Sequence, residues 1–153
     1  MTPSFEVIVR LSGKTLATAE SCTGGGIGAA LTAVPGSSAV YKGGIISYTN
    51  EIKMRLLDVD PETLACCGAV SEPVARQMAA GARKTLAADI AVSVTGLAGP
   101  GGDEFGNPVG TVFIGYSDER ITLAREFHFP GTREAVRNSA IREALRLILE
   151  YNP

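Results

Sequence analysis

Residues 15–34 of the chain, TLATAESCTGGGIGAALTAV, decide the fold. The run 15–19 is β-branched and apolar and suits a short buried strand. It stops at an acid, two hydroxyls and a thiol (20–23), followed by three glycines. Apolar residues then recur at the spacing of a helix: Ile27, Leu31 and Val34. The stretch therefore predicts a buried strand that turns directly into a helix, with reactive side chains on the turn.

Apolar runs bounded by turn residues predict four further strands, at 41–48, 89–96, 111–117 and 121–129, with the last two paired as a hairpin. Helical spacing predicts helices at 5–11, from Asn50 past Leu56, at 61–68, from Ser71 onward, and at 131–151. Strands that alternate with helices are typical of layered α/β proteins. The sequence thus predicts one domain over 1–153, a three-layer α/β/α sandwich with a mixed, mostly parallel five-stranded sheet.

Charge and hydropathy exclude several classes of partner. The net charge of the 153-residue chain is −2, so no excess of basic residues predicts binding to nucleic acid. No apolar run approaches the ~20 residues that span a bilayer, and no signal peptide is evident, so we expect neither a membrane partner nor export. A cytoplasmic location is the expectation.

Three cysteines and one histidine limit redox and metal chemistry. Cys22, Cys66 and Cys67 are an odd number in a chain without an export signal, which predicts reduced thiols. The adjacent Cys66 and Cys67 are expected to be small buried residues. With His128 as the single histidine, no ligand spacing supports a zinc site, so no metal is predicted.

Polar residues gather where three predicted strands end, at 20–26, 48–53 and 95–102. Ligands of open α/β sheets bind beyond the carboxyl ends of the strands, so parallel strands would bring these clusters into one cleft. The last helix can add Arg133 or Arg137. Glycines at a helix start let backbone N–H groups approach an anion, which predicts that the turn after the first strand binds an anion.

The choice of nucleophile follows from the same turn. Ser21 stands where a strand becomes a helix, and Cys22 is its rival. His128 lies in a hairpin strand between two phenylalanines, which argues against a serine–histidine pair. A serine can instead be activated by a buried neutral lysine, and Lys53 is the best placed. Thr95 and the glycine loop after it offer backbone amides for an oxyanion or a phosphate.

Five motifs together resemble the CinA C-terminal domain family, the nicotinamide-nucleotide amidases: LATAESCTGG, PGSSAVYKGGIISYTNEIK, GAVSEPVARQMA, SVTGLAGPGG and NPVGTVFIG. The resemblance runs in order over residues 15–137 and implies deamidation of nicotinamide mononucleotide to nicotinate mononucleotide and ammonia, without metal or redox cofactor. It implies catalysis by Ser21 and Lys53, helped by Tyr48. It also implies a nucleotide pocket formed by Thr23, Gly24, Gly25, Ser38, Thr95, Gly96 and Arg133.

The resemblance further implies the stand-alone form of the domain, without the molybdopterin-binding-like domain that precedes it in some relatives. Two other readings stay open: a non-catalytic nucleotide-binding or regulatory module, and an amidase for another small amide. A homo-oligomer is compatible with the sequence. An Nζ atom of Lys53 within hydrogen-bond reach of a serine hydroxyl would favour an enzyme over a binding module.

Overall fold

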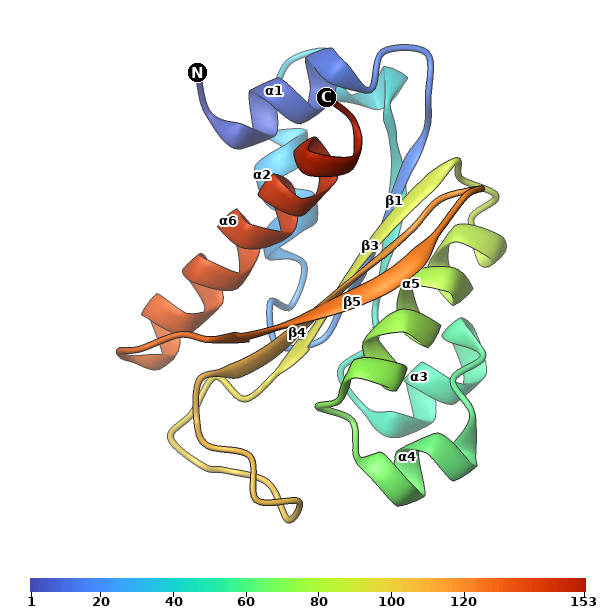
Figure 1. Ribbon diagram of the computed structural model, residues 1–153. Helices are drawn as coiled ribbons and strands as arrows, with labels where there is room; N and C mark the ends of the chain where they lie inside the picture. Colours follow the sequence, from blue (N-terminus) through green and yellow to red (C-terminus); the bar gives the residue numbers. More distant parts are fainter.

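A five-stranded sheet forms the middle layer of the computed structural model, which describes residues 1–153 (Figure 1). The strands are β1 (Leu16–Glu20), β2 (Tyr41–Ile46), β3 (Ile90–Gly96), β4 (Thr111–Ser117) and β5 (Thr122–His128). Their order across the sheet is β2-β1-β3-β4-β5. The strand β1 pairs in parallel with both β2 and β3, whereas β4 is antiparallel to β3 and β5. The predicted mixed, mostly parallel sheet is therefore confirmed.

Helices cover both faces of the sheet and complete the three layers (Figure 1). One face carries α1 (Pro3–Arg10), α2 (Gly26–Thr32) and α6 (Arg133–Tyr151). The other face carries α3 (Asn50–Leu57), α4 (Pro61–Cys67) and α5 (Glu72–Thr85). A short 3₁₀ turn, Ser37–Ala39, leads into β2. The predicted α/β/α sandwich is confirmed.

Alternation along β1 gives each face its own core. Leu16 belongs to the apolar cluster under α1, α2 and α6, while Ala17 and Ala19 belong to the cluster under α3, α4 and α5. Successive strand residues point to opposite faces, so the apolar or small residues of the buried strand β1 contribute to both cores.

Small residues also bring α3 close to α5. A Cβ atom added to Gly81 of α5 would lie 1.9 Å from the carbonyl oxygen of Leu57, at the end of α3. This separation is far below a van der Waals contact, so any side chain at Gly81 would push α3 outward. The position of α3 matters for the site because this helix carries Lys53.

Several predicted boundaries shift by a few residues, for identifiable reasons. The strand predicted at 41–48 leaves the sheet after Ile46, because its partner β1 ends at Glu20. Thr49, rather than Asn50, caps α3, since the Thr49 hydroxyl accepts a hydrogen bond from the N–H of Ile52.

The prediction that Cys66 and Cys67 are buried is wrong. Cys66 is exposed and Cys67 is half-buried, because α4 lies at the surface and they form its last turn. Cys22 is buried, and all three thiols are free. None of the helices combines the length and the apolar character that crossing a membrane requires.

Candidate active site

The turn between β1 and α2 presents Ser21 at the carboxyl end of the sheet. The backbone N–H of Ser21 donates to the carbonyl of Val94 on β3, and Gly24 N–H donates back to the Ser21 carbonyl. Gly24 and Gly25 adopt left-handed φ values of 59° and 103°, which favour glycine. The glycines thus reverse the chain sharply enough for α2 to begin at Gly26, one short turn after the serine.

The predicted anion site at the start of α2 is filled by the protein itself. The carboxylate of Glu20, which is 1% exposed, accepts hydrogen bonds from Ile27 N–H (2.8 Å) and Gly28 N–H (3.0 Å). It also accepts one from the hydroxyl of Thr23 at 2.8 Å. The helix start therefore stabilises an internal carboxylate, and the N–H groups of Ile27 and Gly28 are not free for an anion from outside.

Lys53 meets Ser21 at the floor of the site. Its Nζ donates to the Ser21 hydroxyl oxygen at 3.0 Å and to the Ser47 carbonyl at 2.8 Å. The side chain is 1% exposed because Lys53 lies on the face of α3 that turns inward. No carboxylate forms an ion pair with Lys53, and its burial lowers its pKa to about 8. About a tenth of the lysine is then neutral at pH 7.

A cavity of about 460 Å³ opens above this pair. Three strand ends contribute to it, as predicted: Ser21 and Cys22 after β1, Tyr48 after β2, and 95–101 at the end of β3. The residues that line it include no aspartate or glutamate, whereas Lys53 and Arg133 are cationic. The cavity is therefore suited to an anionic ligand.

Arg133 and Tyr48 meet at the wall of the cavity. The guanidinium of Arg133 donates to the carbonyl of Gly99 at 2.6 Å and to the hydroxyl of Tyr48 at 3.3 Å. Both acceptors are uncharged, so the positive charge of Arg133 has no ionic partner. Tyr48 is 61% exposed and bonds with Arg133 rather than with Lys53.

The other predicted site residues divide into two groups. Thr95 and Gly96 line the cavity, and the Thr95 hydroxyl donates to the carbonyl of Ala69 at 2.9 Å. Thr23, Gly24, Gly25 and Ser38 are not among the lining residues. Ser38 is exposed on the 3₁₀ turn that precedes β2.

Sequence reasoning missed two lining residues, Ala69 and Val70, whereas Asn50 lies in the polar cluster predicted at 48–53. Ala69 and Val70 follow α4 and carry no chemical signal, since their contribution is shape and apolar surface.

The rival residues have other roles. Burial raises the pKa of the Cys22 thiol to about 11, so the reactive thiolate is scarce near neutral pH. Arg137 donates through Nε to the carbonyl of Cys22 (3.0 Å) and through Nη2 to that of Thr23 (3.3 Å), outside the cavity lining. His128 contacts Glu126 on β5 and does not line the cavity.

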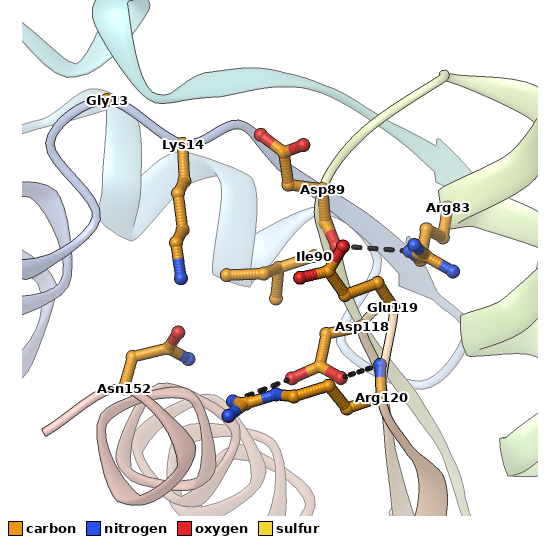
Figure 2. Close-up of a pocket in the computed structure, with 9 residues that line it drawn as sticks. All are labelled: Gly13, Lys14, Arg83, Asp89, Ile90, Asp118, Glu119, Arg120 and Asn152. Atoms are coloured by element: carbon orange, nitrogen blue, oxygen red, sulfur yellow. Dashed lines mark hydrogen bonds and ion pairs between the residues drawn. The ribbon is translucent and has the colours of Figure 1, made fainter.

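A second cavity, of about 320 Å³, lies at the opposite end of the sheet (Figure 2). Its two aspartates are engaged by neighbouring groups of the protein. Asp89 accepts hydrogen bonds from the N–H and hydroxyl of Thr15, and Asp118 accepts from the Tyr116 hydroxyl and from two backbone N–H groups. None of the predicted site residues lies there. No cluster of three or more His, Cys, Asp and Glu residues suited to a metal ion occurs in the fold.

The fold and the cavity define an α/β/α domain with a serine–lysine pair in a cationic pocket at the carboxyl ends of its parallel strands. The chain belongs to the CinA C-terminal domain family, whose model matches residues 4–152.

Similar sequences and structures agree with this assignment. A CinA-like protein of Geobacter sp. strain M21 is 46% identical over 151 residues, which are 99% of this chain and 36% of that protein. A CinA-like protein of Thermosynechococcus vestitus is 51% identical over 138 residues, 88% of this chain and 33% of that protein. The chain thus spans about a third of the length of these curated relatives.

Solved structures match almost the whole chain. A competence-damaged protein (CinA) superfamily protein of Escherichia coli superposes with a TM-score of 0.95 at 36% identity, covering 97% of this chain and 88% of that chain. The competence/damage inducible protein CihA of Agrobacterium tumefaciens also has a TM-score of 0.95, at 40% identity, with 99% and 94% covered.

Proposed function

We propose that the protein is a serine amidase that converts nicotinamide mononucleotide and water to nicotinate mononucleotide and ammonia. The observation that carries the proposal is the 3.0 Å contact between Lys53 Nζ and the Ser21 hydroxyl oxygen at the floor of a cationic cavity. Burying a lysine without an ionic partner costs free energy, and its contact with a serine hydroxyl, which a nucleotide-binding module does not require, favours an enzyme. A nucleophile and its base need this geometry.

The first half of the reaction acylates Ser21. Neutral Lys53 accepts the proton of the Ser21 hydroxyl while the oxygen forms a bond to the carboxamide carbon. The carbon–nitrogen bond then breaks, and the Lys53 ammonium returns the proton to the departing nitrogen, which leaves as ammonia. The 3.0 Å separation permits this transfer without movement of either element.

The second half releases the product. Lys53 takes a proton from a water molecule, the resulting hydroxide attacks the acyl carbon, and the bond to Ser21 breaks. Lys53 returns that proton to the serine oxygen, and the carboxylic acid that forms releases its own proton to solvent and leaves as a carboxylate. A lysine with a pKa of about 8 can serve both as base and as acid near neutral pH.

Backbone amides supply the stabilisation of the oxyanion in this proposal. The N–H of Cys22 follows the nucleophile and donates to no backbone acceptor in the fold. An N–H at the position after a nucleophilic serine is the usual oxyanion donor on a strand-to-helix turn. Cys22 thus contributes its backbone, whereas its thiol takes no part.

The rest of the cavity fits a pyridine nucleotide. Ala69, Val70 and Leu97 offer apolar surface for a planar ring. The unpaired guanidinium of Arg133 suits a phosphate, which it can bind through two parallel hydrogen bonds. The absence of acids from the lining residues avoids repulsion of that phosphate.

Release of ammonia from a panel of amides tests the proposal. The panel holds nicotinamide mononucleotide, nicotinamide riboside, free nicotinamide and simple aliphatic amides. We expect release chiefly from the mononucleotide, its loss in Ser21→Ala, and its retention in the matched control Cys22→Ala.

Release of ammonia from another amide alone would make that amide the proposed substrate. Activity near wild type in Ser21→Ala would show that Ser21 is not the nucleophile. Binding of the mononucleotide without any release of ammonia would favour the regulatory module.

A further inference from the structure

We infer that Arg137 is a positioning residue that fixes the turn carrying the nucleophile. The inference rests on the proposed role of Ser21 and deepens it, since it concerns what holds that side chain at Lys53. Arg137 lies on α6, forms no hydrogen bond with Ser21 and does not itself line the cavity, although Cys22, whose carbonyl it holds, does. Its role is therefore exerted through the backbone of residues 22 and 23.

The contacts of Arg137 are with two consecutive carbonyl groups. Nε donates to Cys22 at 3.0 Å and Nη2 donates to Thr23 at 3.3 Å, and both bonds are partly buried. The carbonyls stand 115 and 114 residues away in the sequence, so the contact joins two distant segments. Arg137 forms no ion pair, and these carbonyls are its hydrogen-bond partners in the fold.

The two contacts fix the orientation of the turn. A peptide group is planar and trans, so its N–H points opposite to its C=O. Holding the carbonyl of Cys22 therefore sets the plane that Cys22 shares with Thr23, and the rigid fork of the guanidinium holds the next plane as well. Rotation of these planes would carry Ser21 away from Lys53.

Glu20 holds the same turn from its other side. Its carboxylate binds the Thr23 hydroxyl and the first N–H groups of α2, as described above. The residues between Glu20 and α2 are thus held by a buried anion inside the fold and by a cation from α6. A displacement of about 1 Å at a nucleophile can cost ~10²-fold in rate, so such fixing has a kinetic consequence.

Arg137 also links the nucleophile to the opposite wall. Arg133 stands four positions earlier on α6, and its guanidinium holds Gly99 and Tyr48. One helix end therefore sets the distance between the serine and the cationic group that faces it. This gives a reason for two arginines at helical spacing with no acidic partner for either.

Covalent labelling of Ser21 tests the inference independently of the substrate. An aryl fluorophosphonate reacts with an activated serine: the Ser21 oxygen bonds to phosphorus, fluoride leaves, and Lys53 takes the hydroxyl proton. The labelling rate, followed by intact-protein mass, is compared in wild type, Arg137→Ala, Arg137→Lys and Arg142→Met. Arg142 is the matched control, since it is exposed on α6 and contacts Ser139 alone.

We expect labelling to fall at least tenfold in Arg137→Ala and less in Arg137→Lys, and to stay unchanged in Arg142→Met. Millimolar guanidinium should restore part of the rate in Arg137→Ala. With nicotinamide mononucleotide, kcat should fall by the same factor with KM nearly constant, and the pH midpoint of the rate should not move.

Equal labelling rates in wild type and in folded Arg137→Ala would overturn the inference, and so would a rise in KM with kcat unchanged. If Arg137→Ala does not fold, a wild-type rate in folded Arg137→Lys without guanidinium overturns it in the same way. Arg137-dependent labelling in a wild type that releases no ammonia would support the inference while the proposed substrate fails.

Discussion

Lys53 combines near-complete burial with the absence of an ionic partner. Its Nζ is held by a hydroxyl and a carbonyl, which satisfy its hydrogen bonds without neutralising its charge. Desolvation then favours the neutral amine, and the pKa falls from 10.5 to about 8. The same burial that makes the lysine a usable base destabilises the folded protein wherever the lysine is charged.

The pH dependence of kcat/KM follows from this pKa. The neutral fraction of Lys53 grows as pH rises through about 8, so the rate should rise with pH below that value and level off above it. We expect an increase of about tenfold between pH 7 and pH 9. Initial rates of ammonia release at saturating and low substrate measure it. A rate that falls steadily over this range would contradict the role of Lys53 as base.

The free energy of unfolding should also depend on pH, because the pKa of Lys53 differs between the folded and unfolded states. Because the folded-state pKa lies below the unfolded one, the unfolded state binds the proton more tightly between pH 8 and 10.5. The cost of the charged lysine is therefore complete below pH 8 and is relieved as pH rises. Relative to Lys53→Met, the wild type should gain about 3 kcal/mol in free energy of unfolding across this window.

Urea titrations of both proteins at several pH values measure this difference. Lys84→Met is the matched control, because Lys84 is exposed on α5 and its replacement should leave the difference from wild type flat. A flat difference for Lys53→Met as well would show that Lys53 is not buried as a cation.

At the scale of elements, the strand-to-helix unit β1–α2 is the best-predicted part of the chain. Its apolar run, its polar turn and its glycines identified the strand, the helix and the placement of Ser21. The filling of the helix start by Glu20 could not be predicted, because an acid before glycines is equally suited to stand in the cavity. Whether such an acid points into the protein depends on the space left between α2 and β2. That space cannot be predicted from the spacing of residues in the sequence.

Glu20→Gln tests this internal cap. The amide keeps one acceptor oxygen and puts an NH₂ group where a second backbone N–H needs an acceptor, so buried donors lose their partner. We expect a loss of about 2 kcal/mol in free energy of unfolding. Glu62→Gln is the control, since Glu62 is exposed in the first turn of α4 and should change stability by less than ~0.5 kcal/mol. Equal effects of the two variants would refute the cap.

At the scale of the whole molecule, the site assembles from segments distant in the sequence. Parallel pairing of β1 with β2 and β3 explains why polar clusters at three strand ends could be expected to converge. The contribution of the Ala69–Val70 segment and the separate tasks of Arg133 and Arg137 could not be predicted. They depend on how α4 packs on α5 and how α6 packs on the sheet, and neither packing leaves a chemical signature in the sequence.

Arg133→Ala tests the long-range part of the assembly. Arg133 reaches Tyr48 across 85 residues and Gly99 across 34 residues, and its charge has no ionic partner. We expect the variant to raise KM for nicotinamide mononucleotide tenfold or more and to lower kcat by much less, since a lost phosphate contact weakens binding first. The riboside, which lacks the phosphate, should be used equally well by both proteins. A variant that still discriminates mononucleotide from riboside as wild type does would contradict the assignment.

Turnover of Lys53→Arg, measured beside Lys53→Ala, tests whether Lys53 is the base that activates Ser21. The guanidinium keeps the positive charge but stays protonated, so it cannot accept the Ser21 proton. We expect both variants to lose kcat for ammonia release by ~10² or more between pH 8 and pH 10, where half or more of the wild-type lysine is neutral. An arginine variant with turnover near wild type and a raised KM would contradict it, and would show that Lys53 holds its substrate by charge alone.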